Sequence, residues 1–251
     1  MEEAQYSYPA ELGIAMFNER GALKPSAYQE LYMQAVEPHL LNIRMDEPRL
    51  IRDFGVAWVL ISMAFEPRRA IRPEEQLHAR TWNSTEKSRL LFRREICFYD
   101  AEERPVLLGA TFSALLDMQT RRVCTDRALA RTFSLPAGET LLEASDRLRL
   151  KTPAEAPVET VTARPSWIDG IGHVNNLRYG ELAYDALTDA QRAQIGALRR
   201  MELFFVSETH LGDTIDLHRI DTERAAIVTA SPAGAARPAF TAKFLFGEEH
   251  A

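Results

Sequence analysis

An internal repeat of about half the chain limits the folds that this 251-residue sequence can adopt. When the sequence is shifted by 151 positions, residues 17–36 (FNERGALKPSAYQELYMQAV) align with residues 168–187 (IDGIGHVNNLRYGELAYDAL). Gly21 aligns with Gly172, and each glycine precedes a run with helical apolar spacing. Each segment therefore predicts an extended stretch, a glycine-containing turn and an amphipathic helix.

Both predicted helices carry start signals and are followed by strand-like residues. Pro25 suits the first turn of one helix, and Asn176 is the expected N-cap of the other. Loops such as DAEERP and DTER supply the turn residues of antiparallel hairpins. The runs that predict strands are 54–65, 76–82, 89–99 and 106–117 in the first half, and 201–207, 213–220, 225–230 and 239–246 in the second.

A helix followed by about four antiparallel strands makes a small α+β unit in which a curved sheet wraps around the helix. Two such units remove exposed edges by pairing their sheets edge to edge, an arrangement known as the double hotdog. We therefore expect two hotdog repeats, one in an N-terminal domain at residues 1–128 and one in a C-terminal domain at residues 158–251. Residues 129–157 are rich in Ala, Pro and charge, which predicts a linker, and 138–149 are expected to contain a short helix.

Composition excludes several classes of protein. The net charge of −6 argues against a general nucleic-acid binder. No apolar run approaches the roughly 20 residues of a membrane span, and the acidic N-terminus lacks the apolar core of a secretory leader. Cys97 and Cys124 cannot form a disulfide framework and are expected to be small packing residues, and no Cys/His cluster predicts a metal site. We expect a cytoplasmic monomer or homodimer that needs no cofactor.

The string SWIDGIGHVNN (166–176) holds the residues with the clearest chemical potential. Asp169 and His173 stand four positions apart, directly before the second predicted helix. The helix N-terminus offers unpaired N–H groups and a partial positive charge. A carboxylate, an imidazole and oriented N–H donors supply a base, a polarising group and an oxyanion site. These groups are sufficient to hydrolyse an acyl ester or thioester.

Two stretches of sequence carry a resemblance to a known family. DGIGHVNNLRYGELAYDAL (169–187) resembles the D-x-x-G-H-V-N-N-x-x-Y signature of hotdog thioesterases. TWNSTEKSRLLFRREICFYDAEERPVLLGATFSALLDMQTRRV (81–123) is similar to the N-terminal pattern of the acyl-acyl carrier protein (acyl-ACP) thioesterases. The resemblance covers nearly the whole chain. It implies hydrolysis of acyl-ACP to free fatty acid and holo-ACP, which ends fatty-acid elongation, with a carrier bearing an acyl-phosphopantetheine as partner.

The resemblance places catalytic roles on three residues. Asp169 and His173 match the aspartate and histidine of the motif, and Glu208 in FFVSETHLGD matches the glutamate on a later strand. Plant members carry Asn where this chain has Ile171, and a Cys often follows the glutamate where this chain has Thr209. Which carboxylate is the base or nucleophile stays open, as does the effect of Ile171.

The first copy of the repeat lacks the ionisable pair, because Asn18 aligns with Asp169 and Ala22 aligns with His173. We therefore expect the C-terminal half to perform the chemistry and the N-terminal half to hold the acyl tail. The apolar residues expected to contact the tail are Phe54, Val56, Trp58, Leu60 and Ile61.

Positive charge is concentrated in residues 65–94, which contain eight Arg or Lys against four Glu. Arg68, Arg69 and Arg72 are the predicted docking residues for the acidic carrier, and solubilising charge is the alternative interpretation. An acyl-CoA thioesterase is the rival enzyme, because the hotdog signature is shared. The rival from another class is a non-catalytic acyl-binding hotdog protein. The sequence does not predict the acyl chain length.

Overall fold

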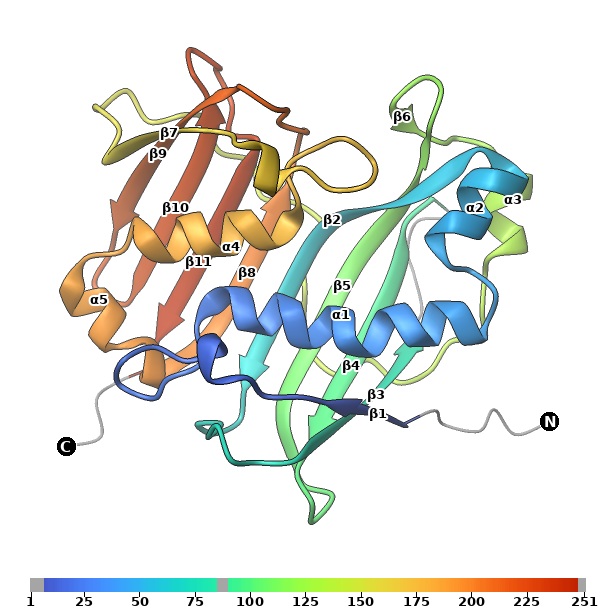
Figure 1. The fold of residues 1–251 in the computed structure, drawn as a ribbon, viewed down its shortest axis with the longest axis horizontal. Coiled ribbons are helices and arrows are strands. Elements are labelled where there is room, and N and C mark those ends of the chain that lie inside the picture. Colours follow the sequence, from blue (N-terminus) through green and yellow to red (C-terminus); the bar gives the residue numbers. More distant parts are fainter. Residues whose placement is uncertain (1–6, 85–89, 248–251) are drawn as a thin grey trace.

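The computed structural model describes residues 7–84 and 90–247, which form one large sheet with two long helices lying across it (Figure 1). The first half contains β1 (Ser7–Ala10), η1 (Ile14–Met16), α1 (Pro25–Asn42), α2 (Glu47–Phe54), β2 (Val56–Pro67), β3 (Leu77–Asn83), β4 (Phe92–Tyr99), β5 (Pro105–Asp117), β6 (Arg122–Val123) and α3 (Arg127–Thr132). The second half contains β7 (Glu159–Thr162), η2 (Pro165–Trp167), α4 (Asn176–Asp185), α5 (Asp189–Ala193), η3 (Ile195–Ala197), β8 (Leu198–Phe205), β9 (Thr214–Asp221), β10 (Ala225–Pro232) and β11 (Phe240–Phe246).

All eight strand-like runs predicted from the sequence form strands, with bounds that agree within three residues. Pro25 is the first residue of α1, as predicted, because its fixed φ and missing N–H suit the first helical turn. None of the helices in the described part of the chain is long and apolar enough to span a bilayer.

The strands form a single sheet in the order β1-β3-β4-β5-β2-β8-β11-β10-β9-β7, with β6 paired to β5 off this path. The two halves meet at the seam between β2 and β8, where Ser62 lies opposite Phe204 and Phe65 opposite Met201. Beyond Ser62, β2 continues toward Val56 against β5 alone, so the halves separate at one end of the seam. The predicted α+β fold with two sheets joined edge to edge is confirmed.

Helices α1 and α4 pack against each other over the seam (Figure 1). They approach most closely at Gln29 and Gly180, which are equivalent positions of the repeat. The Gln29 amide donates to the carbonyl oxygen of Asn176 at 2.9 Å. A Cβ on Gly180 would lie 2.0 Å from Gln29 Oε1, so glycine is needed for this approach. The contact ties the first half to the start of α4.

The turn before each long helix has the same backbone structure in both copies. The Asn18 N–H donates to the Ala22 carbonyl at 2.9 Å, and the Asp169 N–H donates to the His173 carbonyl at 3.0 Å. The glycine within each turn has a positive φ, 73° in the first copy and 88° in the second. The structure therefore confirms the repeat in the register of 151 positions.

Three local predictions were wrong. The N-cap of α4 is Asn175 rather than Asn176, and its side chain accepts the N–H of Leu177 at 2.9 Å. Phe54 ends helix α2, which the sequence reading assigned to a strand-like run. The cause is that the apolar residues of this short helix continue directly into β2.

The short helix expected in 138–149 is also absent, because side chains from the sheet bind the carbonyl groups of this segment. Trp82 Nε1 donates to the Glu139 carbonyl at 2.7 Å, and Ser62 Oγ donates to the Ser145 carbonyl at 2.6 Å. These contacts hold the segment against the sheet without helical structure. Cys97 is buried and packs in the adjacent cluster with Leu142, as expected for a small packing residue.

Candidate active site

The second turn brings Asp169 and His173 together immediately before α4. His173 Nδ1 lies 3.2 Å from Asp169 Oδ2, and the other carboxylate oxygen accepts the Ile171 N–H at 3.1 Å. The His173 side chain is almost fully buried, whereas about a quarter of the Asp169 side chain is exposed. The local spacing of the motif therefore produces the predicted ion pair.

The surroundings of this pair shift both pKa values toward the charged forms. Burial would raise the pKa of Asp169, but His173 and the Ile171 N–H outweigh it, so the pKa lies below its usual value. Burial would lower the pKa of His173, but the carboxylates of Asp169 and Glu208 outweigh it and raise the pKa above 6.5. Both shifts favour the charged pair, a carboxylate beside an imidazolium.

The raised pKa of His173 gives a direct test of the pair. In Asp169→Asn the imidazole loses its main anionic partner, so its pKa should fall. NMR titration of the imidazole should place the pKa above about 6.5 in the wild type and lower in the variant. Because a raised pKa favours the folded state at low pH, the stability that the pair contributes should be lost as the pH rises through the pKa of His173. Equal pKa values in the two proteins would contradict the ion pair.

Glu208 follows β8, the strand of the C-terminal half that borders the seam. Its Oε1 lies 2.6 Å from Arg121 Nη2, and both side chains are only partly exposed. Arg121 sits in the turn between β5 and β6 with a left-handed φ of 55°. The N-terminal half therefore supplies the guanidinium that holds the carboxylate of the C-terminal half. The sequence reading quoted Arg121 within TRRV but gave it no role.

Glu47 is a third carboxyl group at the site that the sequence did not predict. It begins α2, and its Oε1 is buried without a hydrogen-bond partner. Burial, and then the charge of Asp169, raise the pKa of Glu47 above its usual value. No group of three His, Cys, Asp or Glu residues in the described ranges is arranged to hold a metal ion.

The first N–H of α4 points to an oxyanion site. Asn175 caps the helix, and its side chain and carbonyl take the N–H groups of Leu177 and Arg178. The N–H of Asn176 makes no hydrogen bond to the described part of the chain. Free N–H groups at a helix N-terminus stabilise negative charge.

The three predicted catalytic residues lie on the wall of one cavity of about 1360 Å³. Glu47 and Arg121 line the same cavity, as do Asn175 and Asn176. Most of the remaining wall is apolar and comes from α1, α2 and β2, and the residues include Met33, Val36, Leu40, Ile51, Leu60, Met63 and Phe205. The cluster of polar groups therefore opens onto a chamber built mainly by the first half.

Of the residues expected to contact the acyl tail, three line the cavity and two do not. Trp58, Leu60 and Ile61 line the cavity. Phe54 is half-exposed on α2, and Val56 is buried in a separate cluster, so neither lines it. The strand has a bulge between Leu60 and Ser62, which shifts the alternation of its side chains, and simple alternation cannot assign their faces.

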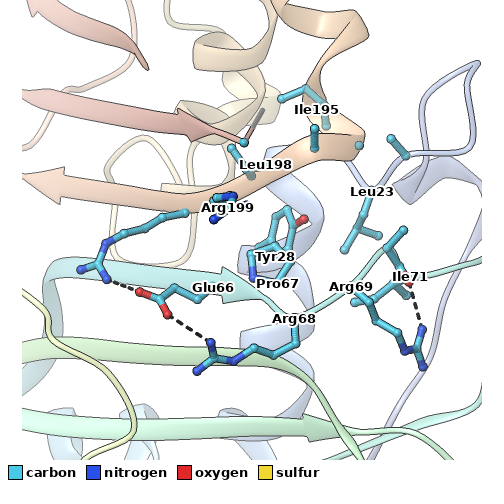
Figure 2. A pocket seen from close by; sticks show the side chains of 16 residues that line it. Leu23, Tyr28, Glu66, Pro67, Arg68, Arg69, Ile71, Ile195, Leu198 and Arg199 are labelled. Atoms are coloured by element: carbon cyan, nitrogen blue, oxygen red, sulfur yellow. Dashed lines mark hydrogen bonds and ion pairs between the residues drawn. The ribbon is translucent and has the colours of Figure 1, made fainter. Parts of the chain in front are cut away.

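The arginines predicted to dock a carrier lie elsewhere. Figure 2 shows Arg68 and Arg69 at a second pocket of about 580 Å³, beyond the end of β2, and Arg72 is not among its lining residues. Arg69 pairs with Glu75 and Asp100, at 2.7 and 3.1 Å. In the register of β2 and β8, Arg68 falls level with Leu198, ten residues from Glu208, so it lies on the order of 30 Å from that carboxylate along the strands.

Thr209 lies one residue beyond Glu208 and has a structural environment. It is buried, and its hydroxyl forms a short hydrogen bond with Tyr179 of α4. Its carbonyl accepts the Val174 N–H at 2.9 Å. These bonds fix the irregular segment after β8 against the turn that holds Asp169. Cys124 is half-buried and packs beside the cluster of Val56.

Comparison with known proteins finds similarity in one segment of the sequence and in the whole fold. Residues 150–232 match the family model described as the acyl-ACP thioesterase C-terminal domain. No curated protein sequence matches the chain. An acyl-ACP thioesterase from Bacteroides thetaiotaomicron superposes with a TM-score of 0.81 at 22% identity, over 96% of this chain and 97% of that one. The 12:0-ACP thioesterase from Umbellularia californica gives 0.81 at 13% identity, over 96% of each chain. The predicted hotdog fold is confirmed, and the matched segment carries the C-terminal domain of the family that the sequence resembles.

Proposed function

We propose that this chain is an acyl-ACP thioesterase, which hydrolyses acyl-ACP to free fatty acid and holo-ACP at the site of Asp169, His173 and Glu208. The match of residues 150–232 to the C-terminal domain of that family supports the proposal. The observation that supports this most is the shared cavity: the polar cluster and the apolar chamber form one continuous space. A thioester placed at the cluster would extend its acyl chain into the N-terminal half.

The chemistry uses groups that the site already holds. Glu208 or Asp169 takes a proton from a water molecule, whose oxygen attacks the thioester carbonyl carbon. The developing oxyanion is stabilised by the Asn176 N–H at the start of α4. The carbon–sulfur bond then breaks, and the His173 imidazolium gives its proton to the departing thiolate. The products are a carboxylic acid and the free thiol of the carrier.

Matched substrates distinguish this function from its rivals. The same acyl group is presented on ACP and on CoA, and kcat/KM is measured for both. The proposal predicts a clear preference for acyl-ACP, whereas an acyl-CoA thioesterase would show equal or better turnover of acyl-CoA. A non-catalytic acyl-binding protein would bind both acyl groups and release no thiol.

We further propose that the carrier docks at the mouth of the cavity. The exposed lining residues Leu41, Val123 and Val206 mark where it opens. Residues 121–131 of β6 and α3 lie beside this mouth and contain four arginines against one aspartate. An acyl group that enters here reaches the catalytic cluster directly, whereas a carrier at Arg68 lies on the order of 30 Å from Glu208 along the strands.

Two triple charge reversals compare these surfaces. Changing Arg122, Arg127 and Arg131 to Glu should raise KM for acyl-ACP by about tenfold and flatten its dependence on salt, because complementary charge speeds association. Turnover of a short acyl-pantetheine thioester should change little. The same reversal at Arg68, Arg69 and Arg72 should leave KM near the wild-type value. The opposite ranking would move the docking surface back to residues 68–72.

A further inference from the structure

The cavity contains a buried cation on the side away from its catalytic cluster. Arg94 of β4 lines the cavity, and only 9% of its surface is exposed. Within the described residues, the Arg94 side chain makes one hydrogen bond, from Nη1 to Thr81 Oγ1 at 3.3 Å. A guanidinium carries five N–H donors, so most of the hydrogen-bonding capacity of Arg94 is open to the cavity.

No carboxylate in residues 7–84 and 90–247 pairs with Arg94. The nearby titratable groups are Tyr8, Tyr32 and His39. Burial and the charge of Arg94 lower the pKa of His39 to about 4, so this imidazole is neutral near neutral pH. An isolated buried charge is costly unless another group satisfies it. The described residues supply no such anion, and the cavity that Arg94 lines can admit one as part of a ligand.

Other polar groups surround Arg94 at this end. Arg94 lies opposite Asn83 of β3 on one side and Thr111 of β5 on the other. The Thr111 hydroxyl shares a hydrogen bond of 3.2 Å with Tyr32 of α1. Asn83, Tyr32 and Ser113 also line the cavity. We call these residues, with Arg94, the polar end of the cavity.

Sheet geometry sets the distance between the polar end and the catalytic cluster. Arg94 stands in one row of the sheet with Thr111, Met63 and Leu203, so it is three strands away from β8. Three strand spacings correspond to about 14 Å, and Glu208 lies five residues beyond Leu203, which adds about 17 Å along the strand direction. The two components combine to on the order of 20 Å. A long acyl chain that starts at the catalytic cluster and runs extended therefore ends near Arg94.

We propose that the enzyme is selective for acyl chains that carry an oxygen function, a carboxylate or a hydroxyl, at the end far from the thioester. The inference rests on the proposed function for the position of the thioester. A methyl end would press hydrocarbon against the unsatisfied donors of Arg94. A terminal carboxylate would accept two of those donors and neutralise the charge, and a hydroxyl would accept one.

Binding of substrate analogues tests this selectivity without relying on hydrolysis. Acyl-pantetheine amides, in which N–H replaces the thioester sulfur, are prepared with methyl, hydroxyl or carboxylate ends and about 8 to 20 carbons. Calorimetry should show the carboxylate form binding about tenfold or more tightly than the methyl form at about 16 carbons, with the hydroxyl form between them. Equal affinities of the wild-type protein for methyl and carboxylate ends would overturn the proposal.

Variants then assign the preference to Arg94. Arg94→Met and Arg94→Gln should each remove the preference for a carboxylate end, with melting curves to show that the variants are folded. Arg80→Met is the matched control, because it also removes a guanidinium charge from the same sheet. Arg80 is partly exposed, pairs with Glu103 and does not line the cavity. A preference that survives in both Arg94 variants would contradict the assignment.

Kinetic measurements on the ACP thioesters distinguish a failure of this inference from a failure of the proposed function. The corresponding ACP thioesters should show the same order in kcat/KM as the amides show in affinity. If the amides show the preference but no thioester is hydrolysed, the proposed function fails and the selectivity stands. If plain thioesters are hydrolysed as well as oxygenated ones at every length, the selectivity fails and the function stands.

Discussion

Asp169→Asn and Glu208→Gln are each expected to lower kcat for acyl-ACP by about 100-fold or more, because each removes a carboxylate that serves as base or nucleophile. Both changes keep nearly the same shape, so melting temperatures should stay close to the wild-type value. His173→Ala should also reduce kcat, through loss of the proton donor. Single-turnover kinetics with a purified acyl-ACP provide the measurement.

The double variant tests whether the two carboxylates act together. Groups that act as a unit are not additive, so Asp169→Asn combined with Glu208→Gln should be scarcely slower than the more damaging single change. Cys97→Ser should leave kcat almost unchanged, because Cys97 packs on the sheet outside the cavity. Near-wild-type turnover in both single variants would contradict the mechanism. It would favour the alternative of a non-catalytic acyl-binding protein.

Arg121→Met is expected to lower kcat by about tenfold while KM for acyl-ACP changes little. Arg121 touches no part of the proposed reaction itself; it acts by holding the Glu208 carboxylate at 2.6 Å. Arg121→Lys keeps the charge but loses the fork of donors, and should restore only part of the activity. Partly exposed ion pairs contribute little to stability, so both variants should melt near the wild-type temperature.

The control for Arg121 is again the pair of Arg80 with Glu103. Its N–O distance is also 2.6 Å and its arginine is similarly exposed. Arg80→Met should therefore leave kcat unchanged. If Arg80→Met and Arg121→Met reduce kcat to the same degree, the effect of Arg121 is a general one on the sheet and the positioning role is contradicted.

The parts of the fold and site that the sequence predicted are those carried by local pattern. Apolar runs and turn residues gave the strands, and the repeat gave two equivalent units. Asp169 and His173 were predicted as a pair because they are four residues apart in one turn. Glu208 came from resemblance alone, since nothing in its local sequence marks it as catalytic.

The missed residues depend on contacts between distant parts of the chain. Arg121 and Glu208 are 87 residues apart and meet only because the sheets join at the seam. Glu47 was missed because α2 was not predicted. Arg94 stands in a strand with many charged residues, and a one-dimensional pattern cannot distinguish a guanidinium in a cavity from one in solvent. A signal that would have helped is the helix start D-E-P before residue 49, with Gly55 as the stop.

The duplicated turn has the same backbone shape in the copy that lacks the ionisable pair as in the copy that carries it. Asn18 Oδ1 accepts the Arg20 N–H at 3.0 Å, just as Asp169 Oδ1 accepts the Ile171 N–H at 3.1 Å. An amide oxygen and a carboxylate oxygen both accept the backbone N–H that closes the turn. The shape of the turn therefore does not depend on the charge of the carboxylate. The helix after the uncharged turn is 18 residues long, against 10 in the second copy. Substrate choice and catalysis can evolve on separate halves of this chain.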